Sequence, residues 1–379
     1  MLPLAASAQP LLRGTRCGSA NSDYKFSINS PTGGVAYVIS FNGSFILNIV
    51  YGTQAELVAQ GATLCPGGLT KTLNGTLGGL AAGDIATISM GGVSASASGN
   101  TSYILNTVPG GVQDLIAGDA TIVGTSFATQ VKKIIIRRNQ NPANNSTFPV
   151  LDFSAAEAFA PASATLTLAN GGSDALSSTA LYFTTNGATG AFSTDASSSA
   201  TRTYYGIPSA QQAAGDLHGV TALASVVNFS GVSQIRSVSM YFKDVANKTL
   251  TFGPVPNNVT VTAAATTPVA RLRSQWTVQS EYNKFFLLSY SQAVGATTRT
   301  VTITTTTAYL GGNPTAIDQT IPDLSVVSGW DNNWGLRAGT ATNYTTSAVG
   351  WNFAAGAFGN VPLEGGVVLT GQKLGTLTP

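Results

Sequence analysis

Charged residues are scarce in this chain. They make up 9% of its 379 residues, and the net charge is only +2, whereas about 25% of a typical soluble protein is charged. The one basic cluster, KKIIIRR at residues 132–138, fits a strand with apolar side chains at its centre and solvated charges at its ends. Nucleic-acid binders need several basic clusters interleaved with aromatic residues. We therefore predict no nucleic-acid partner.

Histidine and cysteine are nearly absent. His218 is the only histidine, and Cys17 and Cys65 are the only cysteines, so any catalysis that needs an imidazole base has to use His218. Asp216 and Gly219 flank it in a turn-like stretch, where we expect the imidazole to hydrogen-bond nearby backbone in a structural role. Two thiols and a distant imidazole do not make a four-ligand metal site. We predict no metal and no cofactor.

Signatures of nucleophilic catalysis are missing too. The segment GTSFA at residues 124–128 is similar to the nucleophile segment of subtilisin-like proteases, which would make Ser126 the nucleophile. That family places its Asp and His upstream of the serine, whereas His218 lies downstream. The segment also runs into a strand-like stretch instead of a helix, so we reject the match.

Acidic residues are few and scattered. Only Asp152 with Glu157 and Asp318 with Asp323 lie close together in sequence, and we expect both pairs at the surface. DNNWG at residues 331–335 is a weak match to a calcium loop, and no phosphate-binding glycine loop occurs. We predict that the chain is not an enzyme; a glycosidase with an unrecognised acid pair is kept as an alternative.

Long apolar runs are absent as well. No window approaches the roughly 20 apolar residues of a membrane helix, so we predict no transmembrane segment. Ala6-Ser7-Ala8 before Gln9 matches the small-x-small pattern of a secretory cleavage site, but the apolar stretch ahead of it is short and lacks a basic lead. We expect residues 1–17 to be a truncated signal or N-terminal segment of an exported protein.

Export would bring the two cysteines into an oxidising compartment, where disulfide bonds form. Two cysteines allow a single pairing, so we predict a disulfide between Cys17 and Cys65. Two unrelated buried thiols are the alternative. In the chain-entropy treatment, closing a loop of that length stabilises the folded state by roughly 4 kcal/mol.

The pattern of the remaining residues is that of strands. Ser, Thr, Asn and Gly replace the missing charge, and 43% of the chain is hydrophobic, enough to form packed cores. The clearest strand signal is residues 33–52, a hairpin turning at Asn42-Gly43, because this dipeptide accepts the positive φ of a two-residue turn. Helical candidates are short, at residues 53–60 and 154–160. We predict an all-β fold of two or three tandem β-sandwich domains, Ig-like or transthyretin-like.

Two breaks divide the chain. Residues 139–149 combine Asn, Pro and Ser without apolar periodicity, and residues 263–270 join one strand to the next at Pro268. No repeat of fixed period occurs, so neither a propeller nor a solenoid is expected. The predicted units are a β-sandwich at 18–138, a linker at 139–149, and two further β-sandwiches at 150–265 and 266–379.

One segment resembles a known module. Residues 72–118 are similar to the carboxypeptidase regulatory-like, transthyretin-type β-sandwich, most closely in the stretch whose family pattern is G-x-Y-x-L-x-x-V-P-x-G-x-Y-x-L. The matching residues are Tyr103, Leu105, Val108, Pro109 and Gly111. Asp114 replaces the aromatic residue usual after the turn. The resemblance implies a sandwich over residues 72–138 and lends no catalytic residue, because in that family the module is a non-catalytic attachment.

Aromatic residues gather in the last fifth of the chain. Trp330, Trp334 and Trp351, with Tyr344 between them, are candidates for stacking on sugar rings, because exposed indoles bind carbohydrate in many β-sandwich modules. Packing in a sandwich core or covering its edge is the competing interpretation. The polar context SGWDNNWGL keeps the binding hypothesis open.

These observations predict a non-enzymatic structural or adhesive protein outside the cell or at its surface. Low charge weakens repulsion between copies and unpaired strand edges template association, so we expect a homo-oligomer or polymer, such as a fibre or layer. Four leucines of the N-terminal segment are expected to dock on a neighbouring copy by strand addition: Leu2, Leu4, Leu11 and Leu12. A carbohydrate-binding module with a glycan partner is the alternative.

Overall fold

The structure is a computed structural model of the full chain. It describes residues 11–12, 24–27, 34–41, 43–53, 56–57, 70–99, 101–123, 128–228, 231–354 and 363–379. Strands dominate these ranges, and their only helical pieces are Glu56–Leu57 and the short 3-10 turns η1 (Ser209–Gln211), η2 (Ser280–Tyr282) and η3 (Asn332–Trp334). The all-β prediction is confirmed. No helix in the described ranges is long and apolar enough to cross a membrane.

The predicted N-terminal hairpin forms. β3 (Gly34–Phe41) and β4 (Ser44–Tyr51) pair antiparallel, with Phe41 opposite Ser44 across a two-residue turn. Gly43 has a φ of 77°, the left-handed conformation that such turns require. Alternate side chains such as Ala36 and Leu47 are buried, because successive side chains of a strand point to opposite faces.

The helix predicted at residues 154–160 is wrong. This stretch forms successive turns, in which Ala155 N–H donates to Asp152 O and Ala158 N–H to Ala155 O. Asp152 explains the difference, because its Oδ1 accepts hydrogen bonds from Ser154 N at 2.9 Å and Ser154 Oγ at 2.6 Å. Such local side-chain bonds compete with a helical ladder. For residues 53–60, only part of the segment lies in the described ranges.

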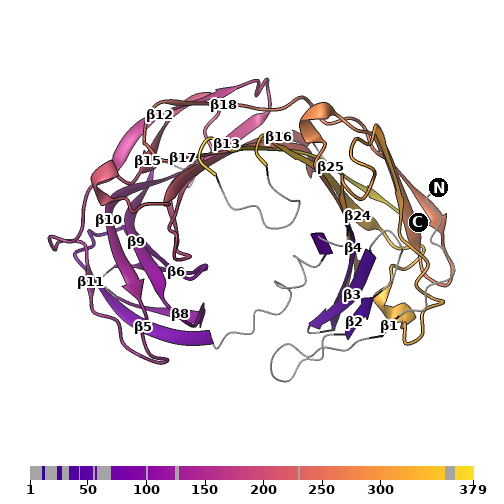
Figure 1. The fold of residues 1–379 in the computed structure, drawn as a ribbon, viewed down its shortest axis with the longest axis horizontal. Helices are drawn as coiled ribbons and strands as arrows, with labels where there is room; N and C mark the ends of the chain where they lie inside the picture. The colour runs from indigo at the N-terminus through magenta and orange to yellow at the C-terminus, as the bar shows by residue number, and fades with distance from the viewer. Residues whose placement is uncertain are drawn as a thin grey trace.

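Among the described residues, sixteen strands form one long sheet. In spatial order its strands are β1 (Leu11–Leu12), β2 (Tyr24–Ser27), β3, β4, β22 (Thr297–Thr306), β21 (Phe285–Val294), β24 (Thr342–Trp351), β25 (Val367–Leu377), β17 (Gly231–Phe242), β16 (Leu217–Asn228), β13 (Ala175–Phe183), β14 (Thr189–Asp195), β10 (Ala128–Gln140), β9 (Gln113–Val123), β6 (Ile85–Met90) and β7 (Val93–Ser98). Neighbours are antiparallel except β4 and β22, which pair in parallel. Figure 1 shows this sheet bent into an open arc.

The described part of the chain also forms three small sheets, each of three strands, which pack on the long one. Their strands are β11 (Leu151–Asp152), β5 (Thr70–Gly78) and β8 (Ser102–Pro109); β15 (Thr201–Gly206), β12 (Ala162–Ala169) and β18 (Lys248–Thr251); and β19 (Thr260–Ala265), β20 (Arg271–Thr277) and β23 (Ala316–Thr320). In Figure 1 the sheet of β12, β15 and β18 lies on the outer side of the arc. Each small sheet and the strands beneath it form a sandwich, and we call these the first, second and third sandwich.

Each sandwich has its own buried core. Leu73 of β5 packs with Ile88 of β6 in the first, and Leu166 of β12 packs with Val220 of β16 in the second. The third core contains residues far apart in sequence: Ala36, Leu47, Leu272, Leu288 and Ile303. A fourth cluster, including Ile116, Ile134, Tyr182 and Phe192, joins the first sandwich to the second.

The parallel pairing of β4 with β22 carries the N-terminal hairpin into the third sandwich. At the break predicted for residues 139–149, Gln140 is the last residue of β10, and Phe148 is buried in the core of the first sandwich. The division into units at 18–138, 150–265 and 266–379 stays a prediction.

Candidate functional site

Two of the candidate tryptophans form a cluster on the third sandwich. The rings of Trp330 and Trp334 are perpendicular, with centroids 5.5 Å apart, and both pack half-buried against the core. Trp330 Nε1 donates to Asn332 Oδ1 at 3.0 Å. Asp331 caps the η3 turn by accepting from Asn333 N at 2.8 Å. The DNNWG stretch is thus a capped turn that holds the two indoles.

The structure brings Tyr344 to this cluster but not Trp351. Tyr344 lies opposite Tyr290 in the β21–β24 register and packs on the same core. Trp351 ends β24, seven residues further on, which is about 23 Å along a strand and on the other face of the sheet. It contacts Phe353, with ring centroids 6.3 Å apart. The four aromatic residues therefore do not form one continuous platform.

His218 is a buried strand residue. It lies in β16 and is 1% exposed. Its Nδ1–H donates to Lys243 O at 2.7 Å, and its Nε2 accepts from Ile207 N at 2.8 Å. Burial lowers the pKa of the imidazole, and the backbone of Lys243 and Phe242 partly offsets this effect. Both ring nitrogens of the neutral ring are thus engaged with backbone, and Phe242 stacks on the ring at 5.5 Å.

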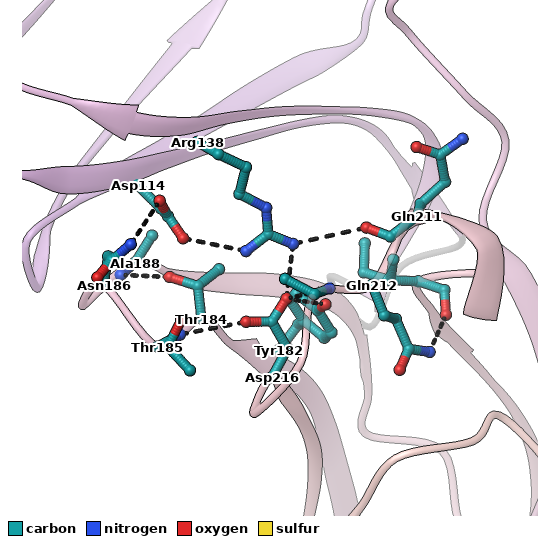
Figure 2. A network of polar contacts seen from close by, with 12 residues as sticks. Asp114, Arg138, Tyr182, Thr184, Thr185, Asn186, Ala188, Gln211, Gln212 and Asp216 are labelled. Atoms are coloured by element: carbon teal, nitrogen blue, oxygen red, sulfur yellow. Dashed lines mark hydrogen bonds and ion pairs between the residues drawn. The ribbon is translucent and has the colours of Figure 1, made fainter.

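A second polar group surrounds Arg138, at the junction of the first and second sandwiches. Figure 2 shows its guanidinium between Asp114 of β9 and Asp216, which precedes β16. Arg138 Nη1 lies 3.0 Å from Asp114 Oδ2, and Nη2 lies 2.6 Å from Asp216 Oδ2. Tyr182 Oη donates to the same Asp216 oxygen at 2.6 Å. Both carboxylates are almost fully buried.

The end of β10 is shaped to place this arginine. The β9–β10 register shifts between Arg137 and Gln140, and Asn139 has a φ of 54°, a conformation that asparagine tolerates better than most residues. Asn139 N–H consequently donates to Asp114 Oδ1 at 2.8 Å. Burial alone would raise the pKa of Asp114, but the Asn139 N–H and the Arg138 guanidinium together lower it. These bonds favour the ionised form of Asp114 and hold Arg138 in place.

A hollow of about 570 Å³ lies beside a second arginine, Arg236. All five N–H donors of its guanidinium are used: Nε and Nη2 donate to Asp174, Nη1 to the carbonyl oxygens of Asn170 and Gly253, and Nη2 also to that of Gly171. A guanidinium has only five such donors. Arg236 therefore holds the surrounding loops and has no donor left for an anion.

Sequence reasoning missed one carboxyl pair, Asp84 and Asp119. Asp84 precedes β6 and Asp119 lies in the neighbouring strand β9; the residues are 3% and 4% exposed. The negative charge of Asp84 acts on Asp119 at short range with both residues buried, whereas the paired carboxyls of a glycosidase lie about 5 to 9.5 Å apart with the sugar between them. Lys132 Nζ contacts Asp84 Oδ2. The alternation of strand residues gave no sign of this cluster, because it joins three strands.

The acidic pairs that are close in sequence lie at the surface. Glu157 pairs with Arg137, and Asp318 with Arg273, and both acidic side chains are at least 40% exposed. Asp323 lies 3.7 Å from Arg271. Within the described ranges, no group of three or more His, Cys, Asp or Glu side chains is placed to hold a metal ion.

The edges of the sheets are the remaining candidates. β7 ends the long sheet, and β6 is its single neighbour among the described strands. Its sequence, VSASAS, contains no charge and no proline, and Ser94, Ser96 and Ser98 are exposed. Other edge strands contain a proline or a charged residue, which protect an edge against pairing: Pro109 ends β8, Lys248 begins β18, and Asp318 lies in β23. β19, at an edge of the third small sheet, is also uncharged.

The remaining site residues of the sequence analysis lie partly outside the described ranges. Cys17, Cys65, Leu2, Leu4 and Ser126 are outside them. Leu11 and Leu12 form β1, which ends the long sheet opposite to β7 and pairs on one side with β2 of the same chain. The disulfide and the docking of the leucines stay predictions.

Comparison with known proteins adds no assignment. No protein-family model matches the chain, and no curated protein matches its sequence. The resemblance of residues 72–118 to a transthyretin-type module therefore stays a prediction.

Proposed function

We propose that this chain is an exported structural protein that assembles with copies of itself, by adding the β1 edge of one long sheet to the β7 edge of the next. The observation that carries the proposal is the uncharged edge at β7, which pairs with β6 alone among the described strands. The contact is head-to-tail, because the two edges differ. Such contacts continue from copy to copy and give filaments unless the rotation closes a ring.

The backbone of β7 is suited to accept another strand. Gly91 and Gly92 have φ values of 59° and 78° and close a two-residue turn between Met90 and Val93. In such a hairpin the residues that flank the turn exchange hydrogen bonds, and the pairs then alternate along the ladder. The N–H and C=O groups of every second residue, Ser94, Ser96 and Ser98, therefore point away from β6.

The side chains along this edge also favour addition. Serine is small and uncharged, so an added strand would meet no steric block and no unpaired charge. The ionic groups of the chain support the proposal indirectly. Arg138 and Arg236 both bind groups of the chain itself, as expected of a protein that uses its few charges for its own fold.

Electron microscopy and sedimentation of the purified chain test this proposal. We expect filaments or large particles whose fraction rises with concentration. Ser96→Lys should abolish them, because it places a charge at the centre of the edge. Ser209→Lys, in the exposed η1 turn, adds the same charge elsewhere and should assemble normally. A strictly monomeric wild-type chain, or equal assembly by both variants, would refute the proposal.

Carbohydrate binding through Trp330 and Trp334 is the second candidate. The observation in its favour is that the two half-buried indoles lie together in a loop at the surface of the third sandwich. Binding of the wild-type chain on a glycan array, lost in a folded Trp330→Ala variant, would support it. Trp351→Ala is the matched control, because Trp351 lies at the other end of β24.

A further inference from the structure

Three side chains meet at the end of the core of the first sandwich: Asp84 before β6, Asp119 in β9 and Lys132 in β10. Asp119 lies in β9 opposite Ala86 of β6 and Lys133 of β10. The β9–β10 register shifts between Val131 and Lys133, so Lys132 is the extra residue of a bulge, and a bulge redirects the side chain it carries. Lys132 Nζ thereby contacts Asp84 Oδ2.

The two carboxyl groups are buried, while the lysine reaches them from the surface. The side chain of Asp84 is 4% exposed and that of Lys132 is 36% exposed. No N–H or O–H group of the described residues donates to Asp119 Oδ1. The charges of Asp84 and Lys132 both act on Asp119, so the three groups lie within short range of one another.

The Asp119 carboxyl group binds a proton more readily than an ordinary aspartate does. Burial, and then the negative charge of Asp84, raise the pKa of Asp119 to about 6, although the positive charges of Lys132 and Lys133 oppose the rise. A primary amine, a carboxyl group in contact with it and a second carboxyl group that can accept and return a proton are the groups needed to form an amide. All three are fixed by adjacent strands.

We propose that Lys132 and Asp84 condense to an intramolecular amide bond, with Asp119 as the proton-transfer group. A proton passes from the Lys132 ammonium to the Asp84 carboxylate, and the neutral Nζ attacks Cγ of the resulting acid. Asp119 accepts the second proton from nitrogen and returns a proton to the departing hydroxyl group. The N–C bond forms, the C–O bond breaks, and one molecule of water leaves. No oxidant and no cofactor is required.

The neighbouring lysine is a natural comparison. Lys133 faces Asp119 in the β9–β10 register and is exposed, but it makes no ion pair with Asp84 among those the described residues form. The bulge thus selects Lys132 for the bond. The amide would tie the start of β6 to β10 across β9. The inference stands on this cluster alone and does not depend on the proposed assembly.

The positions of the methionines give a direct test. Cyanogen bromide cleaves after Met90 and Met240, and Met90 lies between Asp84 and Lys132. With the amide, the fragments 2–90 and 91–240 stay joined after reduction and denaturation, and their combined mass is lower by one water. Cys17 and Cys65 both lie in the first fragment, so a disulfide cannot mimic the link. Two separate fragments from folded wild-type chain would overturn the proposal.

Matched variants assign the link to its residues. Lys132→Arg keeps the positive charge but should give two separate fragments, whereas Lys133→Arg should stay linked. Asp119→Asn keeps the size of the side chain and should lose or strongly slow the link. Circular dichroism of each variant before cleavage shows whether it has folded. Linked fragments from Lys132→Arg, or a full-rate link in folded Asp119→Asn, would contradict the assigned roles.

Acylation provides an independent readout that does not depend on cleavage. An amine-reactive acetyl donor, applied to the unfolded wild-type chain, should modify Lys133 and leave Lys132 unmodified, because an amide nitrogen does not react. Burial cannot explain that protection in an unfolded chain. Acetylation of Lys132 to the same extent as Lys133 would refute the amide.

Discussion

Arg138 Nη2 lies 2.6 Å from Asp216 Oδ2, although 78 residues separate the two in sequence. The contact bridges β10 of the first sandwich and the start of β16 in the second. The same guanidinium also binds Asp114. One side chain therefore contacts two buried carboxyl groups at the junction of two sandwiches.

Replacing Arg138 should lower the free energy of unfolding substantially. Arg138→Met retains much of the apolar stem but leaves Asp114 and Asp216 buried without a counter-charge, and breaking a buried ion pair in this way costs about 3–5 kcal/mol. Denaturant unfolding measures the change in the free energy of unfolding. Arg273→Met is the control, because its pair with Asp318 is about 44% and 43% exposed and surface pairs contribute about 0–1 kcal/mol. Similar losses for both variants would show that the junction does not depend on the network.

Local features of this fold were predictable from sequence, and long-range features were not. The hairpin at Asn42-Gly43 follows from turn chemistry within a few residues. The Arg138 network and the parallel β4–β22 pairing join residues up to about 250 positions apart, and no local pattern encodes which distant strand becomes a neighbour. The short helix expected at residues 154–160 is a third case, in which the side chain of Asp152 binds the backbone of Ser154 and favours a turn over a helix.

The candidate site residues also divide into those that the sequence could group and those that only the fold brings together. The two tryptophans of SGWDNNWGL could be grouped from sequence because they lie four residues apart. The carboxyl pair of Asp84 and Asp119 could not, since its members meet only through the β6–β9 register. His218 was expected in a turn and lies instead in β16, but its bonds to backbone are those expected of a structural histidine.

His218 should make stability depend on pH. Its pKa is lowered in the folded chain, so the unfolded chain binds more protons below the ordinary pKa of about 6.5. The stability from the neutral ring is fully present above that pH and is lost as the pH falls toward the folded pKa. The raised pKa of Asp119, about 6, acts in the opposite direction over an overlapping range. The pH dependence of wild-type stability alone therefore does not isolate the contribution of His218.

The variant His218→Gln isolates the contribution of His218, because a glutamine amide donates and accepts hydrogen bonds but does not titrate. We expect the free energy of unfolding to fall more steeply between pH 7 and 5 in the wild type than in this variant, with the Asp119 contribution common to both. Urea unfolding at closely spaced pH values measures the two curves. Parallel curves would mean that the folded imidazole titrates normally.

The predicted disulfide has a simple chemical test. Thiol titration of the denatured, unreduced chain should find no free thiol, because Cys17 and Cys65 are the only cysteines and export would oxidise them. After reduction, two thiols should appear per chain. Two free thiols before reduction would argue against the exported compartment, and one disulfide between two chains would make the cysteines a link between copies.

The strongest test of head-to-tail assembly is a mixture of two chains with one blocked edge each. Ser96→Lys blocks the β7 edge and keeps β1, whereas a variant that begins at Gly18 lacks β1 and keeps β7. Each alone should remain folded by circular dichroism and stay monomeric in sedimentation. Mixed, the intact β1 of one can pair with the intact β7 of the other, so dimers should form that cannot grow by the β1–β7 contact, because one chain carries a lysine at β7 and the other lacks β1. Filaments from either variant alone, or a mixture that stays monomeric while the wild type assembles, would assign assembly to other edges.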